Sequence, residues 1–137
     1  MIVRIHRLCQ GQLPEYKSEG AAGMDCYVRS VVVTETQIMY RLGFRIEIPD
    51  GYVGLVIPRS SVVNTPLRMA NAVGVIDSDY RGEVTATFDS DTLEGTYAIG
   101  ERCCQLIIVP VARVELLPVQ ELSETERGAG GYGSTGK

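Results

Sequence analysis

The chain contains 137 residues, 45% of them hydrophobic, and carries a formal net charge of −4 at pH 7. A chain of this length predicts a single domain with one hydrophobic core. The negative charge gives no attraction for a DNA or RNA backbone, and no apolar run approaches the ~20 residues that span a bilayer, so we expect neither nucleic acid nor a membrane as a partner.

Short runs rich in valine, isoleucine and threonine follow one another along the chain, with turn-forming residues between them. They cover residues 2–7, 28–33, 44–48, 52–57, 84–88, 105–109 and 112–116. The chain lacks the ~3.6-residue apolar period of a long helix, and only a single helical turn is expected after Ser60. The pattern is typical of an all-β protein that folds as a sandwich, jelly roll or barrel.

The segment 74–83, Gly-Val-Ile-Asp-Ser-Asp-Tyr-Arg-Gly-Glu, places a carboxylate, an aromatic ring and a cation between two apolar runs. We expect the flanking residues to form a β-hairpin, with Gly82 free to take positive φ. Free backbone groups between its arms would bind the edge of a flat heterocycle as a third strand would. The alternative is a surface turn in which Asp77 and Asp79 bond local N–H groups.

The carboxyl-terminal segment 128–137 is rich in glycine and reads Gly-Ala-Gly-Gly-Tyr-Gly-Ser-Thr-Gly-Lys. Such a segment buries little surface, so we expect it to be mobile when no ligand is bound. Its backbone N–H groups could surround phosphate oxygens, with Arg127, Ser134 and Thr135 as further donors. The alternative is a disordered tail without a role.

The four cysteines, Cys9, Cys26, Cys103 and Cys104, lack the spacing of metal ligands, and the chain's one histidine is His6. The amino-terminal end also lacks the long apolar stretch of a signal peptide. We therefore expect reduced thiols in a cytoplasmic protein, or in the host-cell cytosol if the chain is viral.

Four further segments carry polar groups at positions where turns or strand ends are expected. They are Ala21-Ala-Gly-Met-Asp25, Pro58-Arg-Ser-Ser61, Gly100-Glu-Arg-Cys-Cys-Gln105 and the tail from Arg127 to Gly136. Together with segment 74–83, and in this order, they closely resemble the five motifs of the trimeric deoxyuridine triphosphatases (dUTPases). The resemblance runs from about residue 20 to the end of the chain.

The resemblance implies a jelly-roll subunit over residues 1–126, a carboxyl-terminal lid over residues 127–137, and a homotrimer with active sites shared between subunits. It implies Mg²⁺-dependent hydrolysis of dUTP to dUMP and pyrophosphate. This reaction would keep uracil out of DNA and supply dUMP for thymidylate synthesis.

The resemblance also implies roles for residues near the nucleoside. Asp77 would activate the water that attacks the α-phosphorus. Tyr80 would stack under the deoxyribose and exclude a ribose 2′-hydroxyl. The uracil edge would bind the backbone or side chains of Asn71, Gly74, Val75, Ile76 and Thr85. Tyr132, where most relatives carry phenylalanine, would cover the uracil ring.

Other residues are implied at the triphosphate. Asp25 would hold Mg²⁺ through its waters. Phosphate contacts are expected from Arg59, Ser60, Ser61 and Gln105, and γ-phosphate contacts from Arg127, Gly133, Ser134 and Thr135. Gln105 could lie near the uracil instead, and Arg102 could equally be a structural ion-pair partner.

Two other functions stay open at this point. Deoxycytidine triphosphate deaminases resemble the same scaffold, but they carry a catalytic glutamate where this chain has Thr87. A regulatory module that binds nucleotide without turnover is the other function. A purely structural trimer would have no reason to gather these charged and amide side chains.

Overall fold

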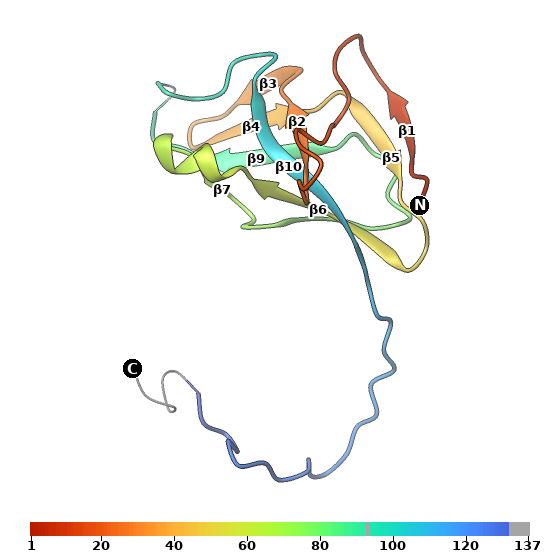
Figure 1. Ribbon diagram of the computed structural model, residues 1–137. Helices are drawn as coiled ribbons and strands as arrows, with labels where there is room; N and C mark the ends of the chain where they lie inside the picture. Colours follow the sequence, from red (N-terminus) through yellow and green to blue (C-terminus); the bar gives the residue numbers. More distant parts are fainter. Residues whose placement is uncertain (93, 132–137) are drawn as a thin grey trace.

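The computed structural model describes residues 1–92 and 94–131 (Figure 1). Within this part of the chain, ten strands and one short 3₁₀ helix form an all-β protein. The elements are β1 (Arg4–Arg7), β2 (Met24–Tyr27), β3 (Ser30–Val33), β4 (Gln37–Arg41), β5 (Phe44–Glu47), β6 (Tyr52–Pro58), η1 (Ser60–Asn64), β7 (Arg68–Met69), β8 (Gly74–Ile76), β9 (Thr85–Asp89) and β10 (Arg102–Pro110). The helical turn expected after Ser60 is confirmed as η1.

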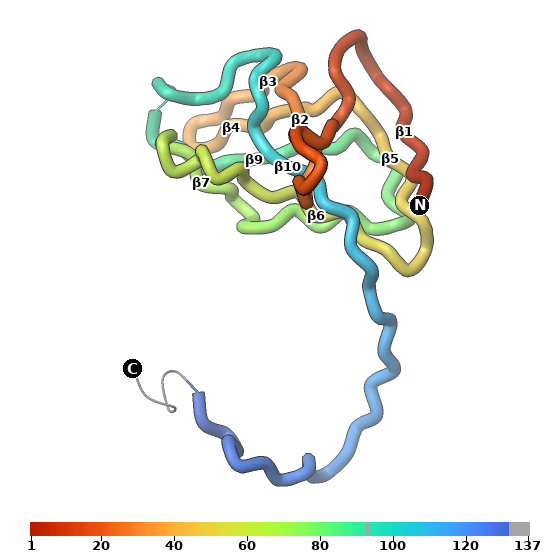
Figure 2. The backbone as a smooth tube through the Cα atoms, in the orientation of Figure 1, coloured from red at the N-terminus to blue at the C-terminus, as the bar shows by residue number. Residues whose placement is uncertain are grey.

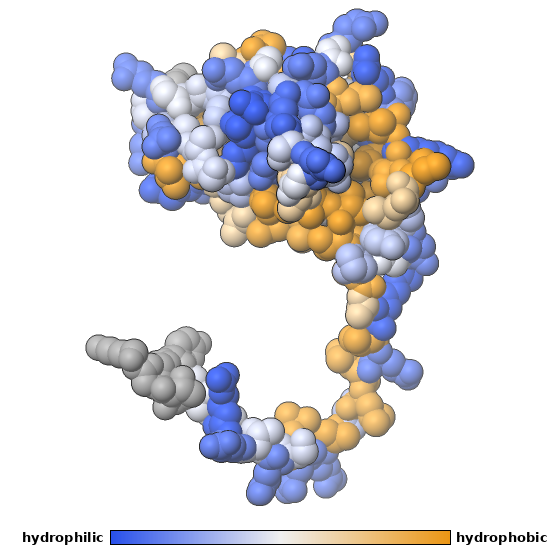
Figure 3. Space-filling view, viewed as in Figure 1, coloured by the Kyte–Doolittle hydropathy of each residue, from blue (hydrophilic) through white to orange (hydrophobic). Residues whose placement is uncertain are grey.

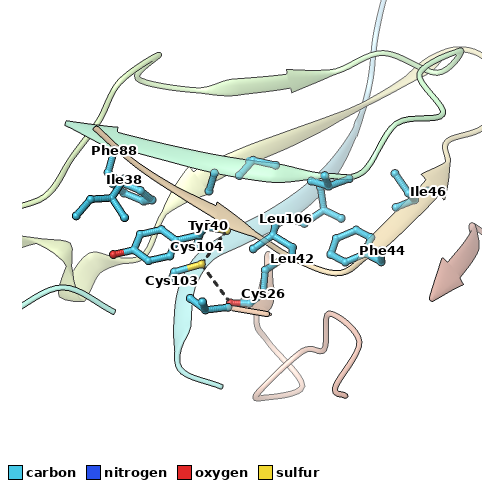
Figure 4. Packing of buried hydrophobic residues seen from close by; sticks show 14 of the residues in the cluster. Cys26, Ile38, Tyr40, Leu42, Phe44, Ile46, Phe88, Cys103, Cys104 and Leu106 are labelled. Carbon is cyan, nitrogen blue, oxygen red and sulfur yellow. Dashed lines mark hydrogen bonds between the residues drawn. The ribbon is translucent and has the colours of Figure 1, made fainter. Parts of the chain in front are cut away.

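Two four-stranded antiparallel sheets, with orders β2-β10-β6-β8 and β3-β4-β9-β7, make up the body, and β1 pairs with β5 beside them. Alternate residues of β4, β5 and β9 are buried, the period-2 pattern of strands that cover a core with one face. Buried residues from both large sheets, among them Val56, Leu106, Tyr40 and Phe88, belong to one hydrophobic cluster (Figure 4). The expected all-β, jelly-roll-like sandwich is therefore confirmed.

The buried thiols lie in this core. Cys26, Cys103 and Cys104 are fully buried, Cys9 is exposed, and all four are free. The pKa of the Cys104 thiol is raised well above its ordinary value, chiefly by hydrogen bonding with Cys103 and Cys26 and then by burial. The neutral thiol is therefore the stable form, as expected for an inert core cysteine.

The strand predicted over residues 112–116 is wrong. From Val111 to residue 131 the chain has no regular secondary structure, is exposed, and runs away from the body as an extended arm (Figures 1 and 2). The composition of residues 112–116 suits a strand, but no other described segment of the same chain pairs with them. The run 28–33 also differs from expectation, because a break after Tyr27 divides this region into β2 and β3.

The predicted hairpin around residues 77–83 is also wrong. β8 pairs with β6, whereas β9 pairs with β4 and β7, so the two arms belong to different sheets. The segment between them connects the two layers of the sandwich. Gly82 does not use the positive φ that glycine permits. None of the described residues forms a helix with the length and hydrophobicity needed to cross a membrane.

Candidate active site

A cleft of about 230 Å³ lies beside β8, and it is lined by Asn71, Gly74, Val75, Ile76, Asp77, Tyr80, Glu83 and Thr85. All of the nucleoside-site residues predicted from segment 71–85 are therefore brought together. β8 ends its sheet and pairs only with β6 among the described strands, so its other edge carries unpaired N–H and C=O groups. The predicted backbone edge is present, although at a sheet margin and not between hairpin arms.

The turn that enters β8 holds an unusual backbone conformation. Ala72 has φ of 57°, in the left-handed region that residues with a side chain rarely adopt. The Ala72 N–H donates to the Met69 carbonyl over 3.1 Å, which closes the turn. At Gly74 an added Cβ would lie 3.2 Å from the Val56 Cβ and 3.6 Å from the Asn71 Nδ2. The tight contact is the one with Val56, so the glycine lets β8 lie close to β6.

Asp77 and Tyr80 are placed by one turn, in which the Tyr80 N–H donates to the Asp77 carbonyl over 3.1 Å. The Asp77 side chain is exposed and has no hydrogen bond or ion pair with any described residue. The same holds for Asp79, so the alternative in which these carboxylates bond local N–H groups is not what the structure shows. The exposed Asp77 carboxylate therefore lines the cleft without a partner among the described residues.

A second cluster surrounds Asp25, whose side chain is 5% exposed. Asp25 Oδ1 accepts hydrogen bonds from Arg59 Nε over 3.2 Å and from Gln105 Nε2 over 3.1 Å. Asp25 Oδ2 accepts one from an Arg102 Nη over 2.9 Å. Arg59 also donates to the Ser61 hydroxyl over 3.3 Å. Two guanidinium groups on one carboxylate leave a net positive charge, which suits an anion such as a phosphate.

The cluster opens onto a cavity of about 470 Å³, which Arg59 and Arg102 line together with Tyr27, Tyr97 and neighbouring loop residues. Of the predicted phosphate-side residues, Asp25, Arg59, Ser61 and Gln105 lie together here, and Ser60 is exposed at the start of η1. The open question about Arg102 has a structural answer, because Arg102 forms an ion pair with Asp25.

The two clusters do not meet within one chain. Ile76 pairs with Gly54 on β6, whereas Gln105 pairs with Ile57 three residues further along the same strand. At ~3.3 Å per residue and ~4.8 Å per strand, Asp77 and Gln105 lie roughly 16 Å apart. Arg127 is exposed and belongs to the arm, which runs away from the body (Figure 2). The other predicted tail contacts, Tyr132, Gly133, Ser134 and Thr135, lie outside the described residues.

The donor set around Asp25 limits how a metal could be held. No group of three or more His, Cys, Asp or Glu side chains that could hold a metal occurs among the described residues. Both Asp25 oxygens already accept hydrogen bonds, and among the described residues Oδ2 accepts only one. A free lone pair on Oδ2 fits a bond from a metal-bound water, which is the manner of binding expected for Mg²⁺.

Two acidic residues were missed by the sequence analysis. The Glu83 carboxylate lines the first cleft, accepts the Gly43 N–H over 3.1 Å and pairs with Arg41 over 3.4 Å. Glu15 forms a β-bridge with Asp25, and its carboxylate accepts bonds from Lys17 and Tyr27. These two hydrogen bonds, that from Lys17 being the stronger cause, lower the pKa of Glu15. The only signal for Glu83 was its place at the end of segment 74–83.

A family model and named relatives both relate this chain to the dUTPases. A dUTPase family model matches residues 10–136. Deoxyuridine 5′-triphosphate nucleotidohydrolase of Anaeromyxobacter sp. (strain Fw109-5) is 43% identical over 130 residues, which cover 92% of this chain and 88% of the relative. The protein of the same name from Bdellovibrio bacteriovorus is 40% identical over 145 residues, covering 100% and 97%.

Solved structures give the same result for the fold. The dUTPase of Staphylococcus bacteriophage 80alpha, solved with dUPNHPP, superposes with a TM-score of 0.85 at 29% sequence identity and covers 99% of both chains. A point variant of that phage enzyme, solved with the same analogue, gives a TM-score of 0.84 at 27% identity and again covers 99% of both chains.

Proposed function

The chain belongs to the dUTPase family, and from this premise we propose that it is a dUTP diphosphatase, which hydrolyses dUTP to dUMP and pyrophosphate. The observation that carries the proposal is the cleft beside β8, where the Asp77 carboxylate lies next to a strand edge and neither has a partner in the described part of the chain. A carboxylate that accepts a proton and an edge that pairs with a base are the two groups this reaction needs.

Uracil binds along the free edge of β8. The backbone groups of Gly74, Val75 and Ile76 pair with its N–H and carbonyl groups, and Asn71 and Thr85 close the ends of the cleft. Buried polar groups that are paired only by the correct base can reject a wrong one by ~10⁴-fold or more. Cytosine mispairs at this edge, and the methyl group of thymine meets the cleft wall.

Asp77 acts as the general base. Its carboxylate takes a proton from a water molecule, which attacks the α-phosphorus in line with the departing pyrophosphate. The free position of the side chain supports this role, because a carboxylate already held by a cation would be a weaker base. Tyr80, on the same turn, lies under the deoxyribose.

The triphosphate binds at the Asp25 cluster. Arg59, Ser60, Ser61 and Gln105 supply donors to oxygens whose charge rises in the transition state. Asp25 would hold Mg²⁺ through its waters, and the ion would supply positive charge that neutralises the triphosphate oxygens. Asp25 also keeps the Arg59 guanidinium and the Gln105 amide in place through the bonds described above.

The active site is completed between subunits of a homotrimer. The separation of Asp77 from the Asp25 cluster in one chain supports this arrangement, because one nucleotide must contact both. The arm supports it too, since it exposes apolar side chains that a single chain leaves in water (Figure 3). These residues are Val111, Val114, Leu116, Leu117, Val119 and Leu122. Exposure of this extent is typical of a surface covered by a partner.

The end of the arm then serves as a lid. Residues 127–137 close over the bound nucleotide, Arg127 with Gly133, Ser134 and Thr135 binds the γ-phosphate, and Tyr132 covers the uracil. Closure excludes water and fixes the in-line geometry. Residues 1–126 form the domain that carries this lid. We place the enzyme in the cytoplasm, where it removes dUTP before it enters DNA and supplies dUMP for thymidylate synthesis.

A panel of nucleoside triphosphates with Mg²⁺ tests this function, with pyrophosphate, inorganic phosphate and ammonia measured separately. We expect pyrophosphate from dUTP at a rate far above that from dCTP, dTTP or UTP. Ammonia from dCTP would identify a deaminase and contradict the proposal, although Thr87 on β9 offers no carboxylate for that reaction. Tight dUTP binding without pyrophosphate would instead indicate a regulatory module.

A further inference from the structure

Gly82 lies directly against the ring of Tyr80. A Cβ added at Gly82 would lie 2.2 Å from the Tyr80 Oη, 2.4 Å from its Cζ and 2.9 Å from its Cε2. No carbon atom can approach that closely, so any side chain at position 82 forces the ring to move. Because the φ of Gly82 is not in the left-handed region, the backbone there would accept alanine. The requirement for glycine is therefore space for Tyr80.

The Tyr80 hydroxyl is held by a hydrogen bond. It donates to the Glu83 carbonyl over 3.1 Å. The Glu83 carboxylate is held by the Gly43 N–H, and the next residue, Val84, exchanges backbone bonds with Leu42 and Phe44 over 3.2 and 3.0 Å. The ring therefore rests between the bare backbone of Gly82 and an acceptor that is anchored to the β4–β5 region.

The position of Tyr80 depends on this support and not on burial. Tyr80 is 43% exposed, so a ring displaced by a methyl group could turn into solvent at a low cost in packing. The core would not be disturbed, because the closest atoms to the added Cβ all belong to Tyr80. A displaced ring would leave space in the cleft at the proposed sugar position.

We propose that Gly82 is a positioning residue that sets the discrimination between deoxyribonucleotide and ribonucleotide by holding the Tyr80 ring against the sugar site. This inference rests on the proposed function, and it deepens that function by assigning sugar selectivity to a residue that touches no substrate. Gly82 acts through Tyr80, and Glu83 anchors the hydroxyl end of the same ring.

The test compares Gly82→Ala with the wild type by kcat/KM for dUTP and for UTP. We expect the dUTP-to-UTP ratio to fall about tenfold or more, while the thermal midpoint changes by less than about 2 °C. Gly20→Ala is the matched control, because an added Cβ at Gly20 meets nothing within 4 Å. That variant should keep both the ratio and the stability.

A second comparison uses Tyr80→Ala as background. Tyr80→Ala itself should lower the ratio, and adding Gly82→Ala should change it no further, because the displaced ring is already absent. An unchanged ratio in Gly82→Ala overturns the inference, and so does an equal loss in the presence and absence of the Tyr80 ring. If the proposed function is wrong, the wild type will not hydrolyse dUTP at all. If the wild type hydrolyses dUTP and the ratios behave as just described, only the inference about Gly82 fails.

Discussion

Asp25 on β2 lies directly opposite Gln105 on β10, and the Gln105 amide donates to the Asp25 Oδ1 over 3.1 Å. This pair connects two segments that are 80 residues apart in the chain. Arg59 and Arg102 bind the same carboxylate, so the predicted phosphate side of the site is already ordered in a single subunit. The predicted nucleoside side, which includes Asp77, lies instead at the β8 edge of the same sheet.

Asp25→Asn should destabilise the fold by about 2 kcal/mol. The substitution removes the charge that compensates two guanidinium groups, and an uncompensated buried charge is costly, although partial exposure of Arg102 reduces the effect. Urea denaturation measures the change. Arg102→Met is the companion variant, with an expected loss below about 1 kcal/mol because the Arg102 side chain is 41% exposed. Equal losses for the two would contradict a central role of Asp25 in the cluster.

Asp77→Asn should lower kcat by about 10³-fold and leave dUTP binding and stability nearly unchanged. The Asp77 side chain has no partner among the described residues, so the fold does not depend on its charge, whereas a general base contributes about 10²–10⁴-fold to the rate. Stopped-flow turnover, equilibrium binding of a non-hydrolysable analogue and thermal melting separate the three effects. Robust turnover in the variant would remove Asp77 from the base role.

Ala72→Gly should stabilise the fold by about 1 kcal/mol or less. Ala72 occupies the left-handed region at φ of 57°, where a Cβ costs roughly 1–2 kcal/mol, and the greater freedom of glycine in the unfolded chain offsets part of the gain. Chemical denaturation provides the measurement. Ala70→Gly, in the same loop but without positive φ, should lower stability, and a loss of equal size at both positions would show that no strain is held at Ala72.

Glu15→Gln should lower the melting temperature at neutral pH but not in acid. Hydrogen bonds from Lys17 and Tyr27 lower the pKa of Glu15 below its ordinary value of 4.5 in the folded state. The stabilising contribution is therefore present above pH 4.5 and is lost as the pH falls through the lower folded-state pKa. Melting curves of both proteins across the acid range should converge, and a difference that persists at the lowest pH would contradict this linkage.

The features that were predictable from the sequence are local ones. The turn that carries Asp77 and Tyr80 is fixed by a few consecutive residues, and so is the turn of η1 after Ser60. Strand pairing is not local. β8 pairs with β6 and β9 pairs with β4, and these pairings depend on residues that are distant in the sequence. The β-like run at residues 112–116 has no partner strand among the described residues of its own chain. For Gly82, the sequence suggested a need for glycine because of backbone conformation. The structure shows that glycine is needed there because the Tyr80 ring leaves no space for a side chain.

In the proposed homotrimer, one subunit supplies Asp77 and another supplies the Asp25 cluster to the same site. Asp77→Asn and Arg59→Ala proteins are each expected to hydrolyse dUTP poorly alone, and should regain hydrolysis when they are unfolded together and refolded. In a random mixture about a quarter of the shared sites would contain both intact residues, so about a quarter of wild-type activity is expected. A mixture that forms mixed oligomers by mass spectrometry and still hydrolyses no dUTP would contradict the shared site.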